Sequence, residues 1–124
     1  MYDKNNVFAK ILRDEIPTGD RKIYEDDFAL AFYDINPMAK IHALVIPKGE
    51  WTDFFDFTTN APAAFQTGFW AAVRAVTKQL GVENQVQLLM NTGAPTQSVF
   101  HFHVHIMAPM ADLMEWYLTE HKKA

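Results

Sequence analysis

The chain of 124 residues contains no cysteine. This absence excludes disulfides and cysteine-ligated zinc, so the fold must be held together by its apolar core. Apolar residues make up 49% of the chain and charged residues 21%, a balance that is ordinary for a globular protein and argues against intrinsic disorder. Because domains with one core cluster at roughly 100–150 residues, we expect a single domain over residues 1–124.

Targeting and membrane signals are also missing. No apolar run approaches the roughly 18–20 residues that cross a bilayer. The N-terminus has no basic region followed by an apolar segment, as a secretory signal would have. The net charge of −4 gives no electrostatic reason to bind long nucleic acid or an anionic membrane, whereas a small phosphorylated ligand needs only a local anion site. We therefore expect a cytoplasmic protein.

Short apolar runs predict five strands. The first two are joined across Asp26-Asp27, a tight hairpin signal, and the third ends at Pro47-Lys48-Gly49. The predicted strands cover residues 22–25, 28–34, 41–47, 85–91 and 99–107.

Helical spacing predicts one main helix and shorter helical segments over residues 7–14, 51–57 and 112–120. Thr58, Thr59 or Asn60 is expected to cap the main helix, with Pro62 in its first turn and Gly81 just after its end. One apolar stripe runs along this helix and must be buried against a sheet. The stripe consists of Phe65, Phe69, Ala72, Val73, Val76 and Leu80.

The order of these elements has no regular alternation of strand and helix, and the short connections favour antiparallel pairing. We predict an α+β domain with a five-stranded, mostly antiparallel sheet, one main helix packed on it, and short helices near the termini.

The run His101-Phe102-His103-Val104-His105 has a period of two. On a strand, its three imidazoles lie on one face about 6.5 Å apart, and the intervening apolar residues, with Phe100 and Ile106, face the core. A buried imidazole without partners costs on the order of 1–3 kcal/mol. Three imidazoles on one face of a strand therefore indicate that these histidines have a function.

Three interpretations are open at this point. The histidines can be ordinary packed or surface residues. They can be zinc ligands, with His42 or Asp34 completing the shell, although no cysteine or second histidine pair is available. Alternatively, a neutral imidazole attacks an electrophilic phosphorus while its neighbours fix its tautomer and hold the anion.

The histidine run resembles the signature of the histidine triad family of nucleotide hydrolases and transferases. Several separate motifs in the same order carry the resemblance, which extends over nearly the whole domain. It is closest to the branch of histidine triad nucleotide-binding proteins, which act on nucleoside phosphoramidates. The other motifs are Val7-Phe8-Ala9-Lys10-Ile11, Ala31-Phe32-Tyr33-Asp34-Ile35-Asn36-Pro37 and His42-Ala43-Leu44-Val45-Ile46-Pro47.

The resemblance implies a covalent mechanism. His103 attacks the α-phosphorus of a nucleoside monophosphate ester or amide, and water then releases the nucleoside monophosphate from the nucleotidyl-histidine. Ser98 assists protonation of the leaving group, and His105 donates to a phosphate oxygen. His101 and His42 support this network.

The resemblance also implies the ligand contacts. Asp34 accepts hydrogen bonds from both ribose hydroxyls, and Asn91 and Gln97 contact the phosphate or the leaving group. The implied ligand is a purine nucleotide of the AMP or GMP type, bound without cofactor or metal by a protein that pairs as a homodimer. The apolar slot for the base consists of Phe8, Ile11, Ile16, Phe32 and Ile35.

The chain departs from the family pattern in three places. The loop before Gln97 is one residue shorter, with Thr96 where glycine is common; the zinc-ligating cysteines of some members are absent; and residues 112–124 do not match the Trp-Pro-rich tail of the nucleotide-binding branch. Two alternative functions stay open. One is a dinucleoside polyphosphate hydrolase that uses the same nucleophile, and the other is a non-catalytic nucleotide-binding regulatory module.

Overall fold

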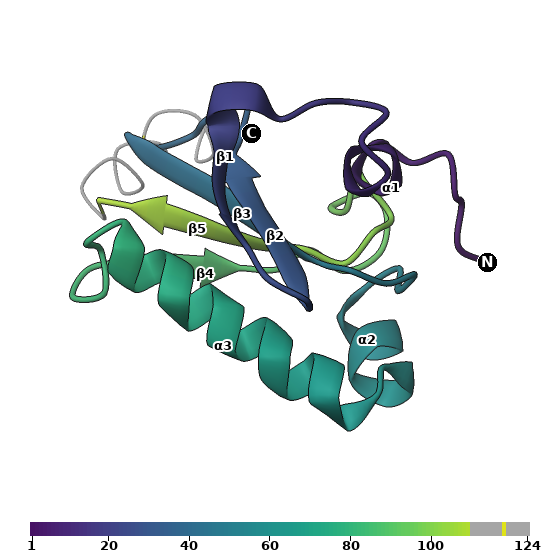
Figure 1. The fold of residues 1–124 in the computed structure, drawn as a ribbon. Coiled ribbons are helices and arrows are strands. Elements are labelled where there is room, and N and C mark those ends of the chain that lie inside the picture. Colours follow the sequence, from purple (N-terminus) through teal and green to yellow (C-terminus); the bar gives the residue numbers. More distant parts are fainter. Residues whose placement is uncertain (110–117, 119–124) are drawn as a thin grey trace.

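The computed structural model describes residues 1–109 and 118, and within them a single antiparallel sheet is covered by helices (Figure 1). The sheet order is β1-β2-β3-β5-β4, and every pair of neighbours is antiparallel. This confirms the predicted α+β fold with a five-stranded sheet. The strands are Lys22–Glu25 (β1), Ala29–Tyr33 (β2), Ile41–Pro47 (β3), Gln87–Leu89 (β4) and Val104–Ala108 (β5).

The helices lie on both sides of this sheet. They are Val7–Leu12 (α1), Phe54–Asn60 (α2) and Ala63–Gln79 (α3), with a 3-10 turn at Gly19–Arg21 (η1). Figure 1 shows α3 along one side of the sheet and α1 on the other. The terminal helix predicted over residues 112–120 lies outside the described residues except for Leu118. None of the helices in the described part of the chain is long and apolar enough to cross a membrane.

Strands β2 and β3 are buried on both faces, because successive side chains of a strand point in opposite directions. The residues that face α3 are mostly small: Ala29, Ala31, Ala43 and Val45. Those that face α1 are larger and pack with Phe8 and Ile11: Leu30, Phe32, Leu44 and Ile46. The small side chains let the long helix approach the sheet closely, and the large ones reach the short helix.

The last predicted strand is shorter than expected. Residues 99–103 lie outside the ladder, and β5 begins only at Val104. The amide of Phe102 donates to the carbonyl of Trp51 at 2.8 Å, so the chain follows the turn after β3 instead of the strand. Phe102 is buried, as predicted, and is stacked on Phe57, but Phe100 is 41% exposed, so its predicted place in the core is wrong.

The predicted cap of the main helix is also wrong. Residues 58–60 belong to α2, which begins after Asp53, whose carboxylate accepts from the Asp56 amide at 2.8 Å. The Thr58 hydroxyl donates back to the carbonyl of Phe54, so it is engaged within α2. Pro62 is the N-cap of α3 and has no side-chain cap bond. The helical turn predicted over residues 51–57 is therefore displaced to 54–60.

Candidate active site

Three strands bring the predicted polar residues to the α1 face of the sheet. His105 pairs with Leu44, which contributes to the core under α1, and His42 lies two residues before Leu44 on the same face. By the same alternation, Asp34, just after the end of β2, lies on the same face as Phe32. His103 lies two residues before His105. The sheet thus brings together side chains that are far apart in the sequence, since Asp34 and His105 are separated by 71 positions.

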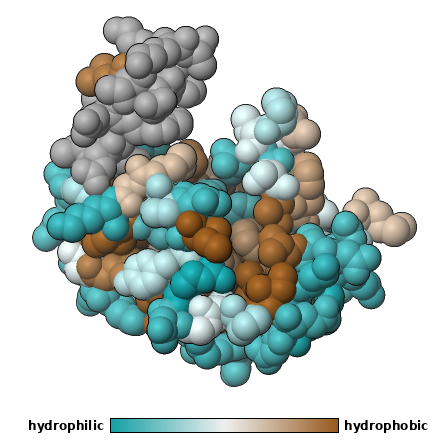
Figure 2. Space-filling model, turned by 90° about the horizontal axis from the view of Figure 1, so that it is seen from above, coloured by the Kyte–Doolittle hydropathy of each residue, from teal (hydrophilic) through white to brown (hydrophobic). Residues whose placement is uncertain are grey.

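A pocket of about 330 Å³ opens between α1 and this face. Its volume is in the range of small-molecule sites. Seen from above, apolar side chains gather in the middle of this side of the molecule, with hydrophilic ones around them (Figure 2). The predicted residues that line the pocket are Phe8, Ile11, Ile16, Phe32, Asp34, Ile35, Ser98, His103 and His105. Its lining also includes Val7, Arg21, Asn36, Leu44 and Val99, which were not predicted.

His103 is held in one tautomer. Its Nδ1 lies 2.6 Å from the main-chain carbonyl oxygen of His101. A carbonyl oxygen can only accept, so Nδ1 carries the proton and Nε2 of the neutral ring keeps its lone pair. The ring of Phe8 packs edge-on against it, with 4.9 Å between the ring centroids. The nitrogen left for a ligand in the pocket is therefore the nucleophilic Nε2.

His105 has the opposite tautomer, set by His42. The amide of Met38 donates to Nδ1 of His42 at 3.0 Å, so the His42 proton is on Nε2. This Nε2 lies 2.9 Å from Nδ1 of His105 and 3.4 Å from Oδ2 of Asp34. Because Nδ1 of His105 accepts, Nε2 of His105 carries a proton. His105 therefore offers the pocket a hydrogen-bond donor beside the lone pair of His103.

His101 lies behind the pocket and does not line it. The residue is fully buried, and its Nε2 donates to the carbonyl of Pro47 at 2.9 Å. Its Nδ1 lies 2.6 Å from the hydroxyl of Tyr2. His101 thus supports His103 through its main-chain carbonyl, whereas its ring is occupied elsewhere.

Burial keeps the histidines neutral, since removing an imidazolium from water costs more than removing the neutral ring. It lowers the pKa of His101 and of His105 to about 4. Burial also lowers the pKa of His103 and of His42 below the usual value, although the hydrogen bond to the His101 carbonyl raises the pKa of His103 and the Asp34 carboxylate raises both. Near pH 7 the site therefore holds a neutral nucleophile and a neutral donor.

Asp34 has two structural roles. One carboxylate oxygen accepts from the amide of Asn36 at 2.8 Å, which forms the turn after β2, and the other lies near His42. The side chain is 17% exposed and lines the pocket. The carboxylate is thus held rigidly at the edge of the pocket, where it can accept hydrogen bonds from a ligand.

The loop before the histidine run is organised by Gln97. Its side chain accepts from the Gly93 amide at 2.9 Å and donates to the carbonyls of Thr52 at 2.6 Å and Val99 at 3.0 Å. Only 3% of Gln97 is exposed, and neither Gln97 nor Asn91 lines the pocket. Among the predicted polar residues of this loop region, only Ser98 lies at the pocket.

Asp34, His42 and His105 also form a cluster of ligand atoms within 4.8 Å of one another. The zinc interpretation expected two histidines of the run with His42 or Asp34 completing the shell, whereas this cluster contains one histidine of the run together with both of those residues. In the structure, the same atoms are joined by the hydrogen bond from His42 to His105 and by the contact with Asp34. These three side chains therefore form a hydrogen-bonded network of two neutral imidazoles and one carboxylate.

Two residues near the site gave no signal in the sequence. Arg21 lines the pocket from η1, with its guanidinium 5.7 Å from the Phe32 ring centroid and Nη1 donating to the carbonyl of Tyr33 at 3.2 Å. Tyr2 reaches His101 from 99 residues away. No local motif in the sequence predicts the position of either residue, because each position depends on how distant segments pack.

Comparison with known proteins shows the family of the chain. The model of the HIT domain matches residues 14–112. A 13.2 kDa HIT-like protein of Azospirillum brasilense is 47% identical over 109 residues, which cover 86% of this chain and 88% of the relative. A HIT-like protein of Helicobacter pylori is 45% identical over 105 residues, with 83% and 95% covered.

Solved structures give the same result. A structure described as a HIT-like protein is 40% identical, with a TM-score of 0.73, and the match covers 84% of this chain and 98% of that one. A HIT family hydrolase from Legionella pneumophila is 30% identical, with a TM-score of 0.73 and 84% and 92% covered. The chain belongs to the HIT family, which confirms the resemblance to histidine triad proteins.

The neutral histidines predict a stability that depends on pH. Above pH 6.5, the usual histidine pKa, the rings are neutral in both the folded and the unfolded chain. The free energy of unfolding then has its full value. Between pH 6.5 and about 4, the unfolded chain binds protons that His101 and His105 of the folded chain exclude, so the free energy of unfolding falls. At about 1.4 kcal/mol per pKa unit, the loss is on the order of 3 kcal/mol for each ring.

Urea unfolding at a series of pH values measures this loss. His105→Asn removes one titrating ring and should flatten the curve between pH 6.5 and 5, with His101 still contributing. A free energy of unfolding that does not change between pH 7 and 5 in the wild type would contradict the neutral state of these rings.

Proposed function

We propose that this chain is a nucleotide hydrolase or transferase that acts on the α-phosphate of nucleoside phosphoramidates or related nucleotidyl compounds. The observation that carries the proposal is the pair of opposite tautomers on one face of the pocket. His103 presents a lone pair and His105 an N–H, with their ring centroids 5.1 Å apart. A nucleophile beside an oxyanion donor suits attack on phosphorus.

In the first step, Nε2 of His103 forms a bond to the α-phosphorus, and the bond from phosphorus to the leaving amine or oxygen breaks. The leaving group takes the electron pair of that bond and a proton, whose delivery Ser98 assists from the edge of the pocket. The ring now carries a positive charge, which is stabilised by the Nδ1–H bond to the carbonyl of His101.

In the second step, water forms a bond to phosphorus and the bond to Nε2 breaks. The electron pair returns to the imidazole, the water releases a proton, and the nucleoside monophosphate leaves. His105 donates to a non-bridging oxygen in both steps, and His42 keeps it in the donating tautomer. Splitting one displacement into two is the general advantage of covalent catalysis.

The other half of the pocket suits a purine nucleoside. In the proposed complex, Asp34 accepts hydrogen bonds from both ribose hydroxyls, and the apolar residues that line the pocket from α1 and β2, with Ile16 and Ile35, form the slot for the base. For Gln97 we propose an indirect role, in which it holds residues 93–97 in place. A contact of Asn91 with the leaving group and a cytoplasmic location stay predictions.

Ser98 favours an amide leaving group over the polyphosphate alternative. An amine leaves only after it gains a proton, whereas a polyphosphate is a good leaving group as an anion. Ser98 lines the same pocket as His103 and His105, so its hydroxyl is the group that we propose for assisting this protonation.

We also propose a homodimer. Among the described residues, β4 pairs with a strand on one side only, and it carries the exposed Leu88, with the exposed Met90 just after it. An open edge with apolar residues favours pairing with a second copy. Sedimentation equilibrium should give twice the chain mass; a monomer at all micromolar concentrations would contradict this pairing.

The reaction class is tested by mass spectrometry after brief exposure to an adenosine phosphoramidate. The wild type should gain one nucleotidyl group, also in the presence of EDTA, because no step requires a metal. His103→Ala should abolish the adduct and turnover, since no other imidazole among the described residues of the pocket presents a lone pair to the ligand. His105→Ala should form the adduct about 10²-fold more slowly, as expected for the loss of one oxyanion donor.

Circular dichroism and thermal melting control for the fold, which both substitutions should preserve because they leave the α3 side of the strand unchanged. Turnover by His103→Ala at a large fraction of the wild-type rate would refute the covalent mechanism, and loss of activity in EDTA would favour a metal site.

The substrate class is tested at Asp34. If its carboxylate holds both ribose hydroxyls, AMP should bind about tenfold or more tightly than 2′-deoxy-AMP, because a hydrogen bond to a charged group contributes roughly 1.5–3 kcal/mol. Asp34→Ala should weaken binding of AMP and abolish the preference. Calorimetric titration measures both, and equal affinity of the wild type for the two nucleotides would remove Asp34 from the ribose site.

A further inference from the structure

Tyr2 is joined to the back of the candidate active site by a short hydrogen bond. Its hydroxyl lies 2.6 Å from Nδ1 of His101, and the two rings meet edge-on with 5.6 Å between their centroids. Nε2 of His101 donates to the carbonyl of Pro47, so Nδ1 of the neutral ring must accept and the hydroxyl donates. Burial raises the pKa of Tyr2, which keeps the hydroxyl protonated.

This bond continues to His103 through residue 101. The ring of His101 is held from two sides, by Tyr2 and by Pro47, and the residue is fully buried. Its main-chain carbonyl accepts the Nδ1 proton of His103 at 2.6 Å. The orientation and tautomer of His103 therefore depend on a residue whose own position is set partly by the hydroxyl of Tyr2.

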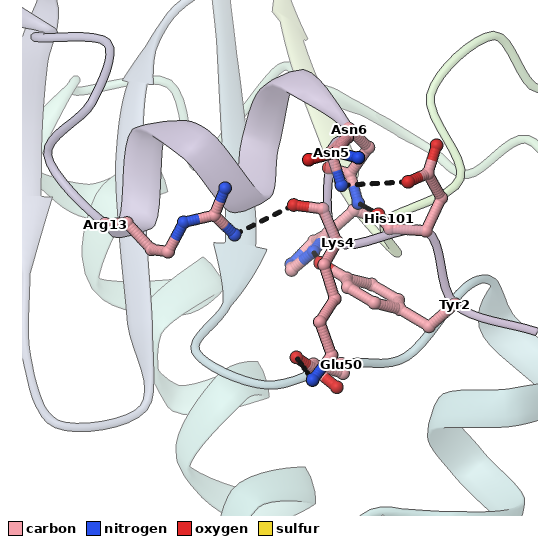
Figure 3. A network of polar contacts seen from close by, with 8 residues as sticks. Tyr2, Lys4, Asn5, Asn6, Arg13, Glu50 and His101 are labelled. Atoms are coloured by element: carbon pink, nitrogen blue, oxygen red, sulfur yellow. Dashed lines mark hydrogen bonds and ion pairs between the residues drawn. The ribbon is translucent and has the colours of Figure 1, made fainter.

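The N-terminal segment that carries Tyr2 is anchored independently of that bond. Figure 3 shows the contacts around it. Nη1 of Arg13, at the end of α1, donates to the carbonyl of Lys4 at 2.8 Å. The ammonium of Lys4 lies 3.8 Å from the carboxylate of Glu50, in the turn after β3. The segment also joins α1, because the Asn6 side chain accepts from the Ala9 amide at 2.8 Å. Tyr2 is thus held at the site by the surrounding structure.

We propose that Tyr2 is a positioning residue for the His103 nucleophile, acting through the ring and the carbonyl of His101. The proposal rests on the covalent reaction proposed above. Without the hydroxyl, the buried Nδ1 of His101 loses its donor, so the ring reorients and its carbonyl shifts. The Nε2 lone pair of His103 then turns away from the line of attack, whereas nucleotide binding by Asp34 and the apolar slot is unchanged.

Tyr2→Phe tests this, with Tyr24→Phe as the matched control. The control also loses a hydroxyl that donates a hydrogen bond, to Asp26 at 2.7 Å, but on β1 and away from the histidines. Single-turnover formation of the nucleotidyl adduct should be about tenfold slower in Tyr2→Phe and unchanged in Tyr24→Phe. The dissociation constant of AMP should be the same in all three proteins. All assays are run well below the melting temperature of each protein, so that a loss of stability alone does not affect the rate.

Two results overturn the proposal. One is a wild-type adduct rate in Tyr2→Phe, and the other is a weakening of AMP binding that accounts for the whole loss of rate. If Tyr2→Phe does not fold at the assay temperature, Arg13→Gln loosens the segment but keeps the hydroxyl. Adduct formation in Arg13→Gln should be slower by a smaller factor, about threefold. A wild-type rate in this variant would also overturn the proposal.

Nitrogen NMR of the histidine rings separates this proposal from the proposed function. In the wild type, His103 should show a protonated Nδ1 and an unprotonated Nε2. Tyr2→Phe should shift these resonances toward a mixture of tautomers, and Tyr24→Phe should not. The spectra require no substrate, so a wild type that forms no adduct would refute the reaction alone. Unchanged His103 resonances in Tyr2→Phe would refute the role of Tyr2.

Discussion

The hydrogen bond from Nδ1 of His103 to the carbonyl of His101 is the interaction on which the candidate site depends. In a regular strand this carbonyl would pair with the neighbouring strand. Here the chain leaves the ladder before Val104, and partners come instead from the end of β3, through the carbonyl of Pro47, and from the turn after it, through the carbonyl of Trp51. The irregular segment thus frees a backbone acceptor for the nucleophile, and within the described residues every buried side-chain nitrogen and oxygen atom has a hydrogen-bond partner.

The two faces of the sheet have different roles in the site. Phe102 and Val104 belong to the core under α3, so the histidine segment is held there by apolar packing. His103 and His105, which alternate with them, line the pocket on the α1 face and can be polar because each has a hydrogen-bond partner. Burial lowers the histidine pKa values, and the hydrogen bonds assign each proton. The same low polarity that keeps His103 a neutral nucleophile also strengthens the donors around it.

Much of this arrangement follows from patterns that are local in the sequence. The period of two in residues 100–107 places the histidines opposite the core residues, and the stripe of the main helix requires a sheet face to cover. With the resemblance of the motifs, these patterns were enough to predict the α+β fold and most of the residues that line the pocket, such as Phe8, Asp34, His103 and His105.

The tertiary structure decided which distant backbone groups each polar side chain meets. Side-chain periodicity repeats within a few residues, but a hydrogen-bond partner depends on which unpaired donors and acceptors the folded chain brings near. For this reason Gln97 bonds to backbone groups of its own loop and of Thr52 instead of lining the pocket, and Phe100 is exposed although its spacing is that of a core residue. For the same reason Tyr2 and Arg21 reach the site from segments without any motif. The sequence by itself determined which residue types share a face, and the packing of the segments determined which of them are joined.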